Sequence, residues 1–512
     1  MVNQIADVNT AYKNLATSPM FKLSLSSKEL FHSNFLEWLS NVDQDDFKGL
    51  ILNMAGINEY NWPAVWRVKR EYNNFDLCIV AYDQFDNNDN EEIDDNEDFR
   101  ILFVIENKVK SIPYKEQLER YAKEAEAKNI VYWNNRAKAL LKKHGLNSEN
   151  KDKKYWIGIE NGKWVLKQGK KGSGKSTQWS SIKYLNEPIF DESDGRKTKT
   201  KFIECYTKRR LSEYPSINYI LLSLAKSFPE YDGNGDWQVK WKDGKIDREV
   251  QWKVCNYSDY CLKVRDKFQT ISTELNSQII EDYCCFIQCL TTLSSNWVKD
   301  YNDQKPFLYK DNKNYTDAHK IRIHDLYQKL KFSHLCTQLY KEIKDHYKGY
   351  SVFPSNQGGL FKEKKVFKPN MKYICVNYTY LHGEPLLEIN VHPATKELYY
   401  VIQVQGNAYE HGIQIKKKKA KKVWDNLVNG KMKIIKGWMN INRNNLEWKG
   451  PDFKVDSKEG NKEYNKYDMN DGTYVYQKYI INSDATIKGV LDQMLKDLKY
   501  VIDQTCTTGV NT

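Results

Sequence analysis

The chain has 512 residues, a hydrophobic fraction of 40% and a formal net charge of +12. The apolar fraction excludes an intrinsically disordered chain, and the length suits roughly two to four domains with a sizeable core. No apolar run in the sequence approaches a membrane span, and the first residues lack the basic start and apolar core of a secretory signal. We therefore expect a cytoplasmic protein without membrane segments. The basic excess suits a polyanionic partner such as nucleic acid.

The ten cysteines of the chain show no paired Cys-x-x-Cys spacing. Cys284, Cys285 and Cys289 fall in an apolar stretch that predicts a buried helix. This pattern argues against a zinc site and indicates reduced thiols.

The first predicted element is an amphipathic helix over residues 28–40, with Ser26 or Ser27 as its cap. A second apolar stretch over residues 47–54 extends this helical entry. Strands are then expected over residues 64–70, 75–81 and 100–106, a helix over 114–128, and strands over 155–159 and 164–167. This alternation predicts a mixed α/β core.

The middle of the chain predicts mostly helices, over residues 217–228, 274–293 and 318–347, with a small hairpin over 232–252. Strands over residues 371–381, 385–393, 397–406 and 472–481 then predict an antiparallel sheet, closed by a helix over 485–504. We therefore expect a core over residues 1–190, a mainly helical region over 191–348, and a C-terminal α+β domain over 349–512. The last of these would recognise a substrate or partner.

Two apolar runs of the core end in charged residues. Asp76 opens the run FDLCIV, whereas Glu106 and Lys108 close the run ILFVIENKV. Side chains alternate along a strand, so Glu106 and Lys108 project from one face and Asn107 from the other. Two carboxylates and a lysine at the ends of buried strands predict a hard-metal phosphodiesterase site, because carboxylates bind magnesium through oxygen.

The order of these motifs resembles the PD-(D/E)xK nuclease superfamily. Gln117 and Tyr121 follow on a predicted helix as Gln-x-x-x-Tyr, and Glu29 and His32 open the first helix as Glu-x-x-His-Ser. The latter motif is similar to one bacterial branch of the superfamily. The first motif departs from the family name, because Phe75 stands where the proline would be. The resemblance covers roughly the first third of the chain.

The resemblance implies a restriction-endonuclease-like mixed-sheet core with flanking helices, and a metal-dependent nuclease activity. It implies a magnesium or manganese ion held by Asp76, Glu106 and the carbonyl oxygen of Asn107. Glu29 would complete the ligand set directly or through water. It further implies a nucleic-acid substrate, with DNA expected, and a role in bacterial anti-phage defence.

The same resemblance assigns roles to four further residues. Lys108 would orient the attacking water or stabilise developing charge. Gln117 and Tyr121 would support the phosphate, and His32 would belong to the site. Each has an ordinary structural alternative: Lys108 as a surface lysine, His32 as a structural histidine, and the Gln117–Tyr121 face as packing.

Residues 169–176 fit the phosphate-loop pattern G-x-x-x-x-G-K-S. A working phosphate loop needs a firm strand before it and a sustained helix after it. The preceding strand is short, and Pro188 limits the following segment to two helical turns. We therefore expect an exposed, mobile loop that does not bind ATP. The basic run over residues 415–424 and the acidic run over 83–98 are solvated segments, or else a backbone-binding patch and a DNA mimic or subunit contact.

The sequence thus predicts a metal-dependent nuclease that acts alone, with a protein partner or as a homo-oligomer. A non-catalytic nucleic-acid-binding protein on the same fold is the first alternative. An ATP-binding protein that uses the loop at Gly169 is the second.

Overall fold

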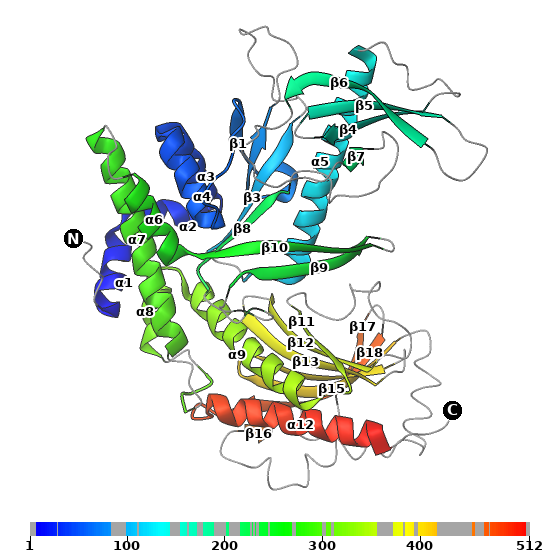
Figure 1. Cartoon of the computed structure of the whole chain (residues 1–512). Coiled ribbons are helices and arrows are strands. Elements are labelled where there is room, and N and C mark those ends of the chain that lie inside the picture. Colours follow the sequence, from blue (N-terminus) through cyan, green and yellow to red (C-terminus); the bar gives the residue numbers. More distant parts are fainter. Residues whose placement is uncertain are drawn as a thin grey trace.

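The structure is a computed structural model with mixed α/β architecture and three described sheets (Figure 1). It describes residues 7–27, 29–82, 99–109, 112–143, 154–160, 163–170, 178–188, 201–203, 216–225, 228, 231, 235–243, 246–268, 273–299, 304–308, 312–355, 372–381, 384–393, 398–416, 453–455, 465–469 and 472–507. The acidic run over residues 83–98 and most of the basic run over 415–424 lie outside this part of the chain.

The first sheet carries both of the apolar runs that end in charged residues. Its strand order is β1-β2-β3-β8-β10-β9. Strands β1, β2 and β3 form an antiparallel meander, β3, β8 and β10 run parallel, and β9 pairs antiparallel with β10. The bounds are β1 (Trp66–Arg70), β2 (Leu77–Ala81), β3 (Arg100–Lys108), β8 (Asn218–Ser223), β9 (Trp237–Asp243) and β10 (Ile246–Asn256).

Burial explains why the central strands are continuous apolar runs instead of alternating ones. Every residue of β2 and β3 is buried. A strand covered by helices on both faces selects apolar side chains at successive positions. The polar residues Glu106, Asn107 and Lys108 are therefore exceptions within a dry strand, and each one needs a specific partner.

Helices cover the two faces of this sheet. Asn107 contacts α3 (Glu29–Val42) through Ser33, whereas Glu106 contacts α5 (Lys115–Lys143) through Gln117. Since neighbouring residues of a strand point to opposite faces, α3 and α5 lie on opposite sides of β3. Helices α4 (Gln44–Ala55) and α6 (Tyr257–Lys267) pack against β8 and β10.

Helix α4 illustrates how the local sequence fixes an element. The Asp43 carboxylate accepts hydrogen bonds at 2.9 Å from the N–H groups of Asp45 and Asp46, which caps the first turn. Gly56 ends the helix with φ of 67°, a left-handed conformation that suits glycine. The remaining described helical elements before α9 are α1 (Val8–Thr17), α2 (Pro19–Ser27), η1 (Tyr72–Asn74), α7 (Glu274–Lys299) and α8 (Lys313–Lys320).

The expected helix over residues 217–228 is wrong, because β8 occupies residues 218–223 and pairs with β3 and β10. The hairpin expected over residues 232–252 is present as β9 and β10, but it belongs to the same sheet. Three strands of the region expected to be mainly helical therefore complete the core sheet. The expected division at residue 190 cuts through that sheet.

The C-terminal sheet confirms the strands expected from sequence. Its order is β11-β12-β13-β14-β15-β18-β16, with β17 paired to β18, and helices α9 and α12 pack against it (Figure 1). The bounds are α9 (His324–His346), β11 (Ser351–Ser355), β12 (Lys372–Leu381), β13 (Glu384–Pro393), β14 (Leu398–Gln405), β15 (Ala408–Lys416), β16 (Phe453–Val455), β17 (Asn465–Met469), β18 (Gly472–Ile481) and α12 (Ile487–Thr507).

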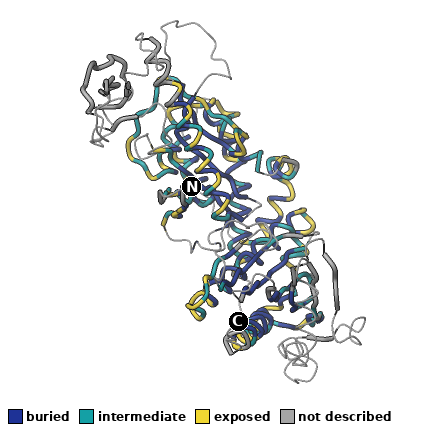
Figure 2. The backbone as a smooth tube through the Cα atoms, turned by 90° about the vertical axis from the view of Figure 1, so that its right-hand side faces the viewer, coloured by how far each residue is buried: buried dark blue, intermediate teal, exposed yellow. Residues whose placement is uncertain are grey.

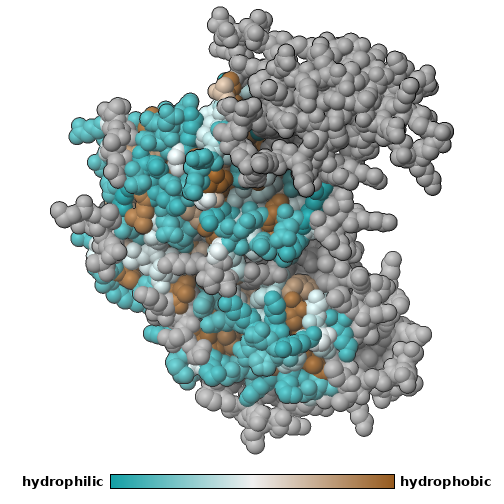
Figure 3. Space-filling view, viewed as in Figure 1, coloured by the Kyte–Doolittle hydropathy of each residue, from teal (hydrophilic) through white to brown (hydrophobic). Residues whose placement is uncertain are grey.

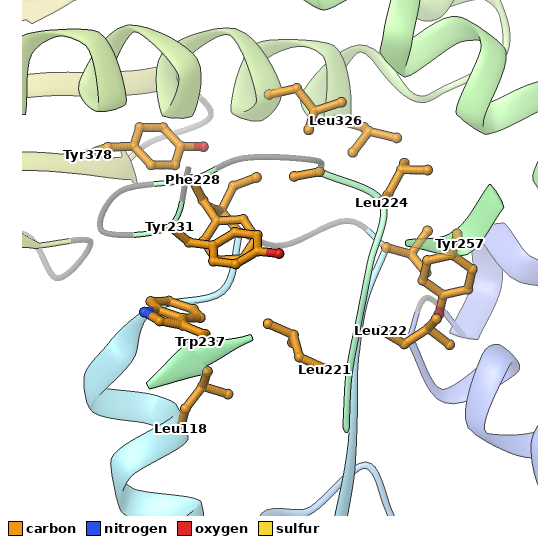
Figure 4. Close-up of a cluster of buried hydrophobic side chains, with 14 of the residues drawn as sticks. Leu118, Leu221, Leu222, Leu224, Phe228, Tyr231, Trp237, Tyr257, Leu326 and Tyr378 are labelled. Atoms are coloured by element: carbon orange, nitrogen blue, oxygen red, sulfur yellow. The ribbon is translucent and has the colours of Figure 1, made fainter. Parts of the chain in front are cut away.

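A continuous apolar core joins the first sheet to the C-terminal sheet. Leu221 and Leu224 of β8 and the following turn lie on one side, and Leu326 of α9 and Tyr378 of β12 lie on the other, with Phe228 between them (Figure 4). Buried backbone accordingly runs from one sheet into the next (Figure 2). The described surface in the view of Figure 3 is mainly hydrophilic, with apolar residues scattered over it. The two sheets therefore form one packed body.

The third sheet contains Gly169 and Lys170, the first two residues of the phosphate-loop string, and has the order β6-β5-β4-β7. Gly169 and Lys170 lie in β5, and β6 pairs with β5 in antiparallel register at Trp179 and Gln178. Gly169 and Lys170 are therefore in a strand and not in the expected loop, the expected helical turns are wrong because β6 occupies that segment, and residues 171–176 lie outside the described residues. The bounds are β4 (Lys154–Glu160), β5 (Lys163–Lys170), β6 (Gln178–Pro188) and β7 (Lys201–Ile203).

This hairpin generates a negative prediction. A phosphate loop needs a helix N-terminus aimed at the anion, and here a strand follows the string instead. We expect no thermal shift on addition of ATP to the wild-type protein, and none in Lys175→Ala. Titration calorimetry that shows micromolar ATP binding, lost in Lys175→Ala, would contradict this expectation.

Candidate active site

Asp76 is held at the start of β2 by the backbone of β3. The N–H of Asn107 donates to Asp76 Oδ2 at 2.7 Å, so the two strand ends are joined across the sheet. The segment that leads into Asp76 is unusual, because Glu71, Asn73 and Asn74 all have positive φ values of 51°, 50° and 69°. Left-handed backbone of this kind costs energy for residues other than glycine, although asparagine tolerates it best.

Glu106 and Lys108 form a buried ion pair on the opposite face from Asn107. Lys108 Nζ lies 2.5 Å from Glu106 Oε1, and the side chains are 6% and 0% exposed respectively. Gln117 Nε2 donates to the same Glu106 oxygen at 2.8 Å and contacts the Tyr121 hydroxyl at 2.7 Å. The structure therefore brings together Asp76, Glu106, Lys108, Gln117 and Tyr121, as the sequence predicts.

Asp76, Glu106 and Lys108 shift one another's pKa. Burial raises the pKa of Asp76. Burial, and then the neighbouring Asp76, raises the pKa of Glu106 to about 8, although Lys108 opposes the shift. Burial alone would lower the pKa of Lys108, but Glu106, Glu29 and Asp76 together raise it.

Glu29 contributes a third negative charge at this place. It stands at the first position of α3, and its charge raises the pKa of both Asp76 and Glu106. Among the described residues that shift one another's pKa here, three carboxyl groups thus face one cation, Lys108. This excess of negative charge suits a further cation.

The donor set fits a hard metal ion through two carboxylates. Glu106 Oε2 is buried, and within the described residues no donor hydrogen-bonds to it. This oxygen and the Asp76 carboxylate are the atoms that could bind a cation, with the Asn107 carbonyl as a further oxygen. Among the described residues, no three His, Cys, Asp or Glu side chains group closely enough to hold an ion by themselves. The Glu29 carboxylate is therefore a neighbour of the Asp76–Glu106 pair and does not form a compact group with it.

His32 is placed differently from the expectation. Its ring is 1% exposed and stacks on Phe286, and its Nδ1 lies 2.9 Å from the Tyr283 hydroxyl. It also meets the Tyr257 ring edge-on, with centroids 5.4 Å apart. These surroundings are those of a structural histidine between α3, α6 and α7, which is the alternative that the sequence left open.

The sequence did not point to two residues that contact the site. Ser33 Oγ accepts from Asn107 Nδ2 at 2.7 Å, and the Tyr257 hydroxyl donates to Asn107 Oδ1 at 3.4 Å. Strand register adds Ser223 and Asn256, which lie in one row with Lys108 across β3, β8 and β10. Ser33 is the final residue of the Glu-x-x-His-Ser motif and could have been found there. Tyr257 is far away in the chain and carries no such signal.

Comparisons with models of known protein families, with curated proteins and with solved structures found no match to this chain. Among the described helices, none is both long and apolar enough to cross a membrane. The cysteines that the structure describes are all free, and most are buried.

The site predicts a pH-dependent stability. An unfolded chain loses the Glu106 proton near pH 4.5, whereas the folded protein keeps it to about pH 8. The folded state binds more protons in this window, so the free energy of unfolding falls as pH rises through it. In Glu106→Gln that fall should shrink by about 1–3 kcal/mol, measured by denaturant unfolding in EDTA. Glu59→Gln, at an exposed site, is the control, and an equal pH dependence in wild type and Glu106→Gln would contradict the expectation.

Proposed function

We propose that this protein is a metal-dependent nuclease of the PD-(D/E)xK type that hydrolyses phosphodiester bonds, with DNA as the expected substrate. The observation that carries the proposal is the meeting of Asp76, Glu106 and Lys108 at adjoining strand ends. The element order also supports a restriction-endonuclease-like core. Helix α3, the meander β1-β2-β3, helix α5 and then β8 parallel to β3 make a mixed sheet with helices on both faces.

Each residue of the site has its own role in the proposed hydrolysis. Asp76, Glu106 and the Asn107 carbonyl would hold a magnesium or manganese ion, with Glu29 nearby. Such an ion supplies a Lewis acid that stabilises negative charge on a phosphate and activates water for attack. Lys108, fully charged and fixed against Glu106, orients that water or stabilises the developing charge. Gln117 holds the Glu106 carboxylate in place, and Tyr121 fixes the amide of Gln117.

A non-catalytic nucleic-acid-binding protein is the main alternative. A fold that had lost catalysis would not need to keep a buried acid and lysine beside a half-buried acid, because burying charge is costly without a compensating role. The intact set therefore favours the enzyme. The hairpin at Gly169 disfavours the ATP-binding alternative.

A cleavage assay tests the proposal directly. Purified protein is incubated with labelled linear, circular and single-stranded DNA and with RNA, in magnesium, manganese or EDTA. We expect cleavage of DNA that requires the metal and stops in EDTA. Binding to these substrates without cleavage in either metal would favour the non-catalytic alternative. Cleavage of circular DNA would further identify an endonuclease.

Substitutions in the site give a sharper prediction. Asp76→Ala, Glu106→Ala and Lys108→Ala should each reduce cleavage by at least about 100-fold, because each removes a group needed for the metal or for charge stabilisation. Folding should survive in Asp76→Ala and Glu106→Ala, since removal of one acid relieves repulsion within an over-charged cluster. It should survive in Lys108→Ala because burial and Asp76 then keep the Glu106 carboxyl protonated and neutral. Activity is measured as initial rate, and folding by circular dichroism and melting temperature. Unchanged specific activity with reduced thermal stability would instead mark the three residues as purely structural.

A further inference from the structure

The peptide that joins Glu106 to Asn107 holds the two halves of the site together. Its N–H binds the Asp76 carboxylate, and the Glu106 side chain leaves from the same peptide unit toward Lys108. The Asn107 side chain points to the opposite face of the sheet and is fully buried there. A rotation of this peptide would therefore misplace both acids at once.

Two hydroxyl groups from different helices clamp that buried amide. Ser33 of α3 accepts from Nδ2 at 2.7 Å, and Tyr257 at the start of α6 donates to Oδ1 at 3.4 Å. The second bond is long, and the Tyr257 ring that carries its hydroxyl is fully buried. The Tyr257 hydroxyl also lies near enough to Glu29 and Asp76 for their charges to raise its pKa, with burial as the larger cause.

Aromatic packing fixes Tyr257 in turn. His32 meets its ring at a 66° angle, and Tyr260 meets it at 88° with centroids 5.8 Å apart. The His32 ring is itself held by the Tyr283 hydroxyl of α7. A chain of contacts thus runs from α7 through His32 and Tyr257 to the amide of Asn107. This explains a histidine in the Glu-x-x-His-Ser motif that stands beside the site without entering it.

We infer that Tyr257 and Ser33 are positioning residues, which act through the Asn107 amide to set the geometry of the Asp76–Glu106 pair. The inference rests on the proposed nuclease function. It goes beyond that function because neither residue contacts the reacting groups themselves. A purely structural role would make their loss change folding stability and leave the catalytic constants alone.

Single substitutions test the effect on rate. Tyr257→Phe and Ser33→Ala each remove one hydroxyl and should lower kcat roughly tenfold with little change in KM, because a small misplacement of catalytic groups slows the chemical step. Ser33→Thr keeps a hydroxyl and should restore most of the rate. Tyr260→Phe is the matched control, since it removes a buried hydroxyl from the same helix but keeps the ring that packs on Tyr257, and it should leave kcat near wild type. Melting temperatures are recorded for all four variants.

A double-mutant cycle tests the route through Asn107. In an Asn107→Ala background the amide is gone, so Tyr257→Phe should cause no further loss of kcat. Additive losses, or equal effects of Tyr257→Phe and Tyr260→Phe, would overturn the inference while leaving the nuclease proposal intact. Calorimetric titration of the wild type with manganese distinguishes a failure of this inference from a failure of the proposed function. A wild-type protein that neither binds manganese nor cleaves DNA would overturn the proposed function, and this inference with it.

Discussion

The buried contact between Glu106 and Lys108, at 2.5 Å, is the constraint on which the rest of the site depends. Taking a carboxylate and an ammonium out of water costs several kcal/mol per ion, and a single contact between them repays this only with further hydrogen bonds. Neighbouring residues supply those hydrogen bonds and hold the site together. Gln117 donates to the carboxylate, the β3 backbone holds Asp76 beside it, and the Asn107 amide is fixed from behind by two hydroxyls. The dry sheet in turn makes each charge–charge interaction stronger than it would be in water.

The fold was predictable where one element could be recognised by itself. The strands around Asp76 and Glu106 and the C-terminal strands follow from local apolar runs, and the helix at residue 29 follows from its amphipathic spacing. The strand β8 was not predictable, because an apolar run of a few residues suits a buried helix as well as a buried parallel strand. Its pairing with β3 joins segments more than 100 residues apart, and no local pattern reveals such a pairing. The expected boundary at residue 190 was misplaced for the same reason.

The residues of the site also fall into a group that the sequence predicts and a group that it does not. Asp76, Glu106, Lys108, Gln117 and Tyr121 come together because spacing along two strands and one helix determines the faces on which they lie. The supporting residues come from elements whose positions depend on tertiary packing. Tyr257 is the first residue of α6. The strand before it, β10, is positioned by its pairing with β8. Sequence spacing therefore gave the groups proposed to carry the chemistry but did not give the groups that hold them in place.

The sign of the charge at the site differs from that of the whole chain. The chain carries a net charge of +12, yet Glu29, Asp76 and Glu106 outnumber Lys108 where the strands end. On the proposed function, the overall charge attracts a polyanion from a distance, while the local acids repel a phosphate that arrives alone. A divalent cation bound there would offset the local negative excess, so phosphate and metal would favour each other at the site. The negative excess is then a means of making phosphate binding depend on the metal, and the buried clamp on Asn107 keeps the two acids close enough for one ion to serve both.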